Sequence, residues 1–144
     1  MKIQILGAHL AEQKGARLTS LLIDGVLVVD AGGLTSALSL PEQKKIKTVL
    51  LTHHHFDHTR DLVTLAANAA YYWQGQLVVY ALRYTLDVVT SCLLDGKIYA
   101  DFLKYPSKEK PTLILEAIEP YSRKTIAGYD VLAVPVKHSV PAVG

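Results

Sequence analysis

The chain has 144 residues, of which 15 are Lys or Arg and 13 are Asp or Glu, so its net charge at pH 7 is +2. Half of the residues are hydrophobic, which excludes a disordered tail, and the small charge excess excludes a nucleic-acid binder that acts through bulk charge alone. The only cysteine, Cys92, has no partner within the chain, so a disulfide-stapled secreted scaffold is also excluded. We expect residues 1–144 to form a single domain.

The N-terminus and the apolar runs bear on the location of the protein. Residues 1–7 alternate between polar and apolar types, unlike the continuous apolar run of a signal peptide. The longest apolar runs, such as residues 77–82, are far shorter than the roughly 18 residues that a membrane span needs. We therefore expect a cytoplasmic protein with no membrane contact.

The first half of the chain alternates short strands and helices. Runs rich in Ile, Leu and Val predict strands at residues 3–6, 20–24, 26–30 and 48–52. Asp24-Gly25 is typical of a tight hairpin. The paired glycines after Asp30 then interrupt the pattern, and residues 34–40 are expected to form a short helix that ends at Pro41.

The second half continues this alternation. Apolar residues at helical spacing predict helices at 59–70 and 82–94. Further strands are expected at 76–80, 112–119 and 129–137, with an irregular stretch at 95–111 and a connection at 120–128. The alternation predicts an α/β fold. Cys92 falls on the apolar side of the second helix and is expected in the core.

The strongest chemical signal directly follows the strand at 48–52. Four of the six histidines lie in the run His53-His54-His55-Phe56-Asp57-His58. Residues two apart in extended backbone point to the same side, so His53 and His55 can aim at one point while His54 points away. Asp57 and His58 add an oxygen and a nitrogen donor, and two ligand pairs predict two divalent ions. The competing interpretation is a solvated histidine-rich loop.

The pattern His53-x-His55-x-Asp57-His58 after a short apolar strand resembles the metallo-β-lactamase superfamily of metallohydrolases. The hairpin that ends in Asp30 and its glycines is also similar to that family, and His138 follows a strand as the family's third ligand does. The resemblance implies a metallo-β-lactamase-like αββα sandwich. It also implies that His53, His55 and His138 hold one metal ion, and that Asp57 and His58 begin a second site. Asp57 would in addition be the catalytic proton acceptor.

Other residues near the motif have two interpretations each. Asp30 is either a carboxylate that orients a ligand histidine or an ordinary turn residue. Arg60 and Lys137 either hold a phosphate or are ordinary exposed cations. The Tyr71-Tyr72-Trp73 run is expected to pack in the core and at a helix end, although its rings could stack on a nucleobase. Histidine and carboxylate ligands suit zinc first, with manganese or iron as alternatives.

Residues 138–144 are similar to the branch that contains ribonuclease Z and the cyclic-nucleotide phosphodiesterases. This branch implies hydrolysis of a phosphodiester bond, in RNA, a nucleotide or another small molecule, by a metal-bridging hydroxide. Two alternatives stay open. One is hydrolysis of a thioester or lactone at the same site, and the other is a catalytically silent metal-binding fragment.

Two features depart from the family pattern. Asp61 stands where the family often has glycine, so it either alters the packing of the helix start or supports the helix N-terminal turn. The family also needs a later acidic ligand and a final histidine, but no acid follows Asp130 and no histidine follows His138. We therefore expect the N-terminal part of the fold, with its C-terminal part missing and its site incomplete. An exposed apolar sheet edge should then favour a homo-oligomer.

Overall fold

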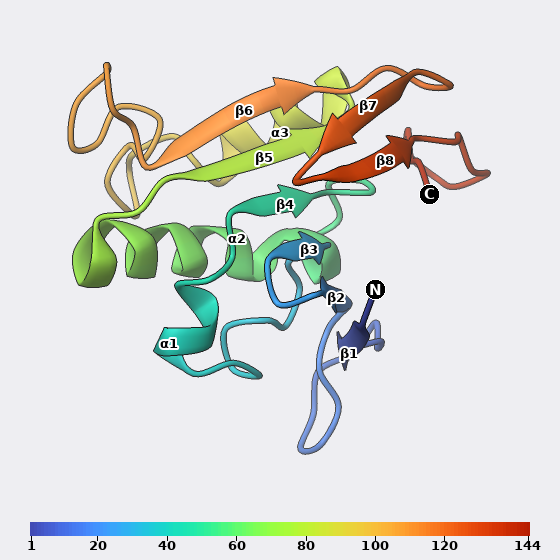
Figure 1. Ribbon diagram of the computed structural model, residues 1–144, viewed down its shortest axis with the longest axis horizontal. Coiled ribbons are helices and arrows are strands. Elements are labelled where there is room, and N and C mark those ends of the chain that lie inside the picture. The colour runs from blue at the N-terminus through green and yellow to red at the C-terminus, as the bar shows by residue number, and fades with distance from the viewer.

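The computed structural model describes residues 1–144 and is built around a six-stranded mixed sheet (Figure 1). Its strands, in spatial order, are β1 (Ile3–Gly7), β2 (Ser20–Ile23), β3 (Leu27–Val29), β4 (Thr48–Leu50), β5 (Leu77–Ala81) and β6 (Leu113–Ala117). The pairs among β1, β2 and β3 are antiparallel, whereas β3 to β6 are parallel. The spatial order therefore follows the chain order throughout.

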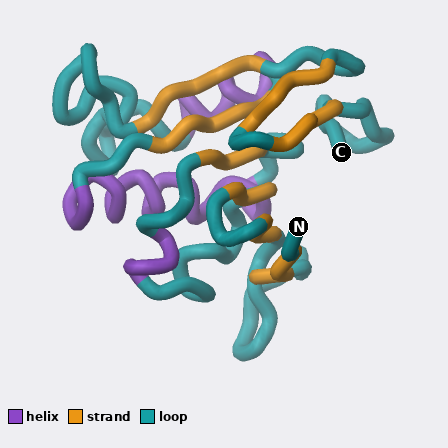
Figure 2. Tube along the Cα trace, in the orientation of Figure 1, coloured by secondary structure: helices purple, strands orange, loops and turns teal.

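Helices make the crossovers that parallel strands require. The helical elements are α1 (Leu40–Gln43), α2 (Phe56–Asn68), the π-helical η1 (Ala69–Trp73) that continues α2, and α3 (Arg83–Cys92). A separate antiparallel pair, β7 (Arg123–Ile126) and β8 (Tyr129–Leu132), follows β6. Loops form the remaining C-terminal segment, which extends beyond the end of β8 and turns back on itself (Figure 2). No helix combines the length and the apolar character that crossing a membrane demands.

The main sheet buries its two faces unequally. Successive residues point to opposite faces, so the paired Val49 and Val79 lie on one face, and Leu50 and Tyr80 lie on the other. The first face packs against α2 and α3 in a cluster of 24 buried residues, which we call the helix-side core. The second face meets β7, β8 and the C-terminal segment in a smaller cluster, the hairpin-side core, of Ile118, Ile126, Ala133 and Val143. This arrangement confirms the predicted α/β class.

The helix predicted at residues 34–40 is wrong. Residues 35–37 form a turn, and α1 begins only at Leu40. The backbone N–H and the hydroxyl of Ser39 both donate to the Glu42 carboxylate, at 2.8 and 2.6 Å, which holds the start of the helix. Pro41 lies in the first turn, where the missing N–H costs nothing, so it opens the helix instead of ending it.

The chain also contains a strand that the sequence pattern does not reveal. The segment 120–128, expected to be a connection, includes β7, whose first three side chains are polar and exposed. The strand predicted at 129–137 ends earlier, at Leu132. Beyond it, Val134 and Gly144 exchange backbone hydrogen bonds of 3.0 and 2.8 Å, so the C-terminus folds back along this segment.

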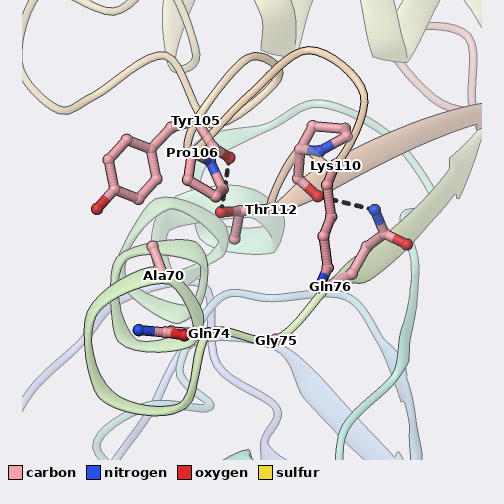
Figure 3. Close-up of a pocket in the computed structure, with 9 residues that line it drawn as sticks. Ala70, Gln74, Gly75, Gln76, Tyr105, Pro106, Lys110 and Thr112 are labelled. Carbon is pink, nitrogen blue, oxygen red and sulfur yellow. Dashed lines mark hydrogen bonds between the residues drawn. The ribbon is translucent and has the colours of Figure 1, made fainter.

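Two predictions of burial are wrong. Cys92, the last residue of α3, is exposed, because the buried stripe through Leu86 and Val89 continues into Leu94 and leaves the cysteine facing solvent. Tyr71 and Tyr72 are 55% and 70% exposed, so they are not core residues, although Tyr71 packs against Phe102 at the helix end as expected. Near them, a cavity of about 250 Å³ opens between residues 74–76 and the loop that precedes β6 (Figure 3).

Candidate metal centre

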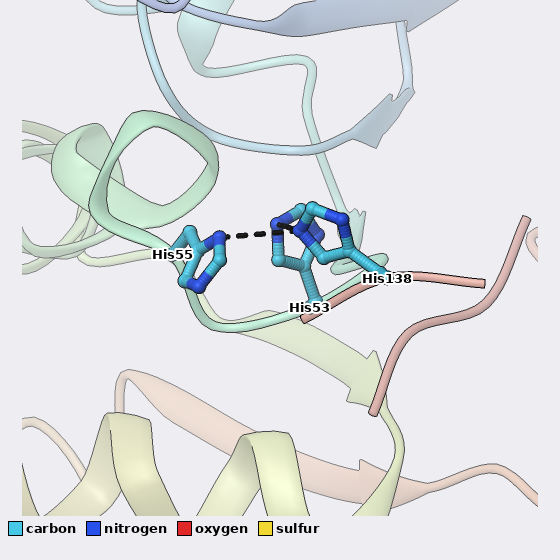
Figure 4. A group of neighbouring side chains, drawn as sticks. All are labelled: His53, His55 and His138. Carbon is cyan, nitrogen blue, oxygen red and sulfur yellow. Dashed lines mark hydrogen bonds between the residues drawn. The ribbon is translucent and has the colours of Figure 1, made fainter. Parts of the chain in front are cut away.

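Three histidines from two distant segments meet at the end of β4. His53 and His55 lie on the loop that joins β4 to α2, and His138 reaches them from the C-terminal segment (Figure 4). The Nε2 of His138 lies 3.1 Å from His53 Nε2 and 3.2 Å from His55 Nδ1. Two nitrogens bound to one tetrahedral ion at about 2.0–2.1 Å lie about 3.3 Å apart. The spacing therefore fits a single metal ion held by three imidazoles.

The three histidines differ in exposure. His53 is 5% exposed, His55 is half-buried and His138 is exposed, and one ring nitrogen from each lies within 4.8 Å of the others. His54 is outside this group. Its ring centroid lies 5.4 Å from that of Tyr84, and its buried Nδ1 has no hydrogen-bond partner. The group thus opens to solvent on the side of His138.

A hydroxyl and a carboxylate determine which nitrogen of His53 carries the proton. The Thr52 hydroxyl donates to the Asp30 carboxylate, with oxygens 2.8 and 3.0 Å away, so it can only accept from His53 Nδ1 at 3.0 Å. This bond assigns the proton to Nδ1 and leaves the Nε2 lone pair directed at the other histidines. The role of Thr52 was not predicted from the sequence, where its only signal is a hydroxyl residue directly before the first histidine.

The same carboxylate orients a second histidine. Asp30 is buried, and its Oδ2 accepts from His58 Nδ1 at 2.7 Å. His58 Nε2 then faces Asp57 Oδ2 at 3.3 Å. The rings of His58 and His53 are 4.2 Å apart, centroid to centroid. Asp57 and His58 therefore present one oxygen and one nitrogen donor directly beside the three-histidine group.

Asp30 reaches this position because the backbone after β3 presses against the start of α2. Asp30 adopts a left-handed conformation with φ of 59°. The next residue, Ala31, donates to the His58 carbonyl at 2.6 Å and accepts from the Asp61 N–H at 2.7 Å. A Cβ on Gly32 would lie 1.9 Å from the Asp57 carbonyl oxygen, so only glycine allows this approach. Gly32 is thus required for the geometry beneath the histidines.

The electrostatic environment acts differently on the buried His53 and the half-buried His58. Burial, followed by the charges of His58 and His138, lowers the pKa of His53 to about 4. Burial also acts to lower the pKa of His58, but the hydrogen bond and charge of Asp30 and the charge of Asp57 raise it overall. His53 is therefore neutral near pH 7, which is the form that binds a metal ion.

The residues that flank the motif have structural partners. Asp61 is buried in α2 beyond its first turn and accepts from the Thr35 N–H and hydroxyl, each at 2.8 Å. The interpretation that it supports the helix N-terminal turn is therefore wrong, because it holds the preceding loop against α2. Arg60 bonds Asp61 and Glu12, so it is not an ordinary free cation. Lys137 is exposed and lies beside His138 in the chain.

Comparison with known families identifies the class of protein. Residues 19–143 match the family described as the Beta-lactamase superfamily domain, so the chain belongs to that family. This match confirms the resemblance drawn from the histidine motif. A curated relative, ribonuclease Z of Methanococcus maripaludis, is 29% identical over 99% of this chain and 46% of its own length. It lies in the branch that the C-terminal residues indicated.

Solved structures support the same fold. The metallo-β-lactamase fold protein YhfI from Bacillus subtilis is 16% identical, with a TM-score of 0.74, over 98% of this chain and 55% of its own. Yeast PDE1 is 17% identical, with a TM-score of 0.70, over 98% of this chain and 59% of its own. The chain thus spans about half the length of the relatives it matches.

Proposed function

We propose that the chain carries the metal-binding half of a metal-dependent hydrolase that cleaves phosphodiester bonds. The observation that carries this proposal is the convergence of His53, His55 and His138, separated by up to 85 residues in sequence, at nitrogen distances of 3.1 and 3.2 Å. A solvated histidine-rich loop would have no reason to gather a distant third imidazole at this spacing.

The donor set supports an assignment of ligands. His53, His55 and His138 would hold one divalent ion, and Asp57 and His58 would contribute to a second, beside the first. Three imidazole nitrogens at tetrahedral spacing favour zinc, while the additional carboxylate is compatible with manganese or iron. Such ions supply Lewis-acid stabilisation of developing negative charge and lower the pKa of water.

The chain's own residues have three tasks in this proposal. Thr52 and Asp30 keep the Nε2 lone pair of His53 directed at the ion, and Asp30 orients His58 directly. Asp57 is the proposed catalytic acceptor for the proton that the attacking water releases. Lys137, exposed next to His138, is positioned to attract a phosphate group.

Phosphodiesters are the proposed substrate class because the curated relative is a ribonuclease. The bond could belong to RNA or to a smaller nucleotide. Hydrolysis of a thioester or lactone would use the same donor set. Metal analysis combined with assays on bis-p-nitrophenyl phosphate, a lactone and a thioester separates these reactions. We expect two ions per chain and turnover of the phosphodiester. Turnover of a lactone or thioester alone would overturn the substrate class.

Histidine variants test the ligand assignment. We expect His53→Ala and His55→Ala to lower the metal content of the purified chain, and His54→Ala, the matched control on the same loop, to leave it unchanged. Equal loss in all three variants would contradict the assignment. One ion or none, with no turnover of any substrate, would instead identify a catalytically silent metal-binding module.

A further inference from the structure

The cavity at the far end of α2 is remote from the histidines. α2 begins directly after His55, and η1, which continues it, ends directly before Gln74. With a rise of about 1.5 Å per helical residue, the two ends lie about 25 Å apart. The cavity of about 250 Å³ therefore belongs to neither the metal centre nor its immediate surroundings.

The walls of this cavity are held in place by specific contacts. One wall is the turn after η1, and the other is the loop that leads into β6. The Gln76 side-chain amide donates to the Pro111 carbonyl at 2.8 Å and joins the two walls. Gly75 lies so close to the indole of Trp73 that a Cβ would be 2.5 Å from it. The cavity is thus preformed, with the chain's single tryptophan against its wall.

The backbone at the turn is unusual. η1 is a π-helix, a rare element that is frequently found at functional sites. It ends at Gln74, which adopts a left-handed conformation with φ of 49° that glycine would accommodate more easily. The Gln74 side chain is exposed, lines the cavity and bonds no other residue. A glutamine at this position therefore adds a free amide to the cavity at a cost in backbone strain.

A cation without a counter-ion lines the opposite wall. Lys110 is exposed and forms no ion pair, and Figure 3 shows its side chain extending from the loop toward Gln76. Another loop lysine, Lys104, is paired with Asp101. Lys108 is also exposed but does not line the cavity. Lys110 is thus the cation best placed to meet an anionic group inside.

Aromatic surface lies at the edge of the same cavity. Tyr105 lines it and is 38% exposed, and its ring centroid lies 5.8 Å from that of Tyr71, which is 55% exposed. Both rings rest against the buried Phe102, at centroid distances of 6.2 and 6.4 Å. Partly exposed aromatic rings and an unpaired lysine around one cavity are the combination with which proteins bind single nucleotides.

We infer that this cavity binds one nucleotide unit, with an adenine base on Tyr105 and its phosphate on Lys110. The Gln74 amide offers one donor and one acceptor, which match the N7 acceptor and N6 donor of adenine. A volume of about 250 Å³ is just below the roughly 300–1,000 Å³ of typical small-molecule pockets, which suits a single nucleotide. The choice of a nucleotide over other flat anions rests on the proposed function.

The fluorescence of Trp73 tests this site directly, because its indole contacts the cavity wall. We titrate the full chain, treated with EDTA so that hydrolysis plays no part, with adenosine monophosphate. We expect a saturable change in emission, and binding weakened about tenfold or more in Lys110→Ala. The matched control, Lys108→Ala on the same loop, should bind within about twofold of the wild type. Equal weakening by both variants would overturn the site in favour of diffuse charge attraction.

A second variant distinguishes loss of binding from loss of folding. Gln74→Gly removes the amide but relieves the left-handed backbone, so the chain should stay folded while binding weakens severalfold. Unchanged binding in this variant would contradict the role of the amide. The fluorescence readout is independent of metal. Retained nucleotide binding without any hydrolysis would therefore overturn only the proposed function. Hydrolysis without nucleotide binding would overturn only this site.

Two ligand forms distinguish the source of the nucleotide. Saturable binding of adenosine monophosphate supports a site for a free nucleotide. Binding of a short oligoadenylate alone supports a site for one nucleotide of a single strand that also reaches the metal centre. Adenosine, which lacks the phosphate, should bind about tenfold more weakly or worse. No change in Trp73 emission with any of these ligands would overturn the inference.

Discussion

The two faces of the main sheet are held by very different amounts of buried apolar surface, and the candidate metal centre draws ligands from both. The helix-side core contains 24 buried residues, whereas the hairpin-side core contains four. His53 and His55 lie on the loop between β4 and α2, and His58 lies in the first turn of α2, where the larger core anchors them. His138 lies on the C-terminal segment, which the smaller core holds. One side of the site is therefore rigid and the other is weakly held.

Few backbone hydrogen bonds connect the His138 segment, residues 133–144, to the rest of the chain. Its backbone pairs with itself, through Val134 and Gly144, and Val143 donates to the Thr52 carbonyl at 3.1 Å. An ion bound by His53, His55 and His138 would add a strong link between the two regions. Binding to the folded state alone stabilises it by mass action, so the region that gains most should be the weakly held one.

The largest expected effect comes from the helix-side core. Leu62 has no exposed surface. We expect Leu62→Ala to lower the free energy of unfolding by about 2–5 kcal/mol, because it removes apolar contacts and leaves a cavity. Chemical denaturation followed by circular dichroism measures the change.

Ile126→Ala is the matched substitution in the hairpin-side core, where Ile126 is 1% exposed. We expect a smaller change in the main unfolding transition but weaker metal binding, because the His138 segment loosens. If both variants lower the global stability equally, the two regions unfold as one unit and the contrast between them is wrong.

The next largest effect concerns the hydrogen bonds that link His53 to Thr52 and Asp30. Thr52→Val keeps the shape of the side chain but removes the hydroxyl that joins Asp30 to His53 Nδ1. We expect metal affinity to fall about 10–100-fold, as is usual when a group that orients a ligand is lost. A competition titration with a metal indicator measures this. Thr48→Val is the control, since Thr48 is a buried threonine that begins β4, about 13 Å of extended chain before Thr52. Unchanged affinity in Thr52→Val would show that packing alone orients His53.

A smaller effect follows from the lowered pKa of His53 in the metal-free chain. Between its ordinary value of 6.5 and about 4, the unfolded chain binds a proton on His53 and the folded chain does not. The stabilisation that comes from keeping His53 neutral is therefore fully present above pH 6.5. It is lost as the pH falls toward 4, because the unfolded chain takes up the proton first. His58 acts in the opposite sense, since its raised pKa stabilises the fold at low pH and that stabilisation is lost as the pH rises through the folded value.

Urea denaturation in EDTA from pH 7 to pH 4 tests this dependence. We expect the free energy of unfolding to fall with pH across this window, and His53→Gln, which cannot titrate, to show a shallower fall. An identical pH profile in the variant would mean that other groups, and not His53, control acid stability.

The smallest effect concerns the part of the main sheet, at the edge strand β1, that the hairpin-side core does not cover. Ile3 and Ile5 on the edge strand β1 are 54% and 69% exposed, and the pairing of Ile5 with Leu21 places it on the face away from the helices. We expect weak self-association through this edge and its loss in Ile5→Lys, measured by light scattering during gel filtration. Ile98→Lys is the control, because Ile98 is 87% exposed on a loop. A monomeric wild type would exclude this interface.

Much of the fold and part of the site could be predicted without the structure. Apolar runs and helical spacing indicated β1 to β6, α2 and α3, because these elements depend on the pattern of neighbouring residues. The histidine motif indicated which side chains share a side, since the period of extended backbone determines that locally. β7 could not be found in this way, because its Arg-Lys-Thr sequence carries no apolar alternation.

The sequence by itself determined the class of fold and the chemistry of the loop after β4, because both depend on side chains close together in the chain. Only the tertiary structure decided that His138 lies 3.1 Å from His53, that Thr52 links His53 to Asp30, and that Cys92 faces solvent. These features depend on how separate elements pack, and packing is a sum of many weak contacts between residues that no local pattern relates.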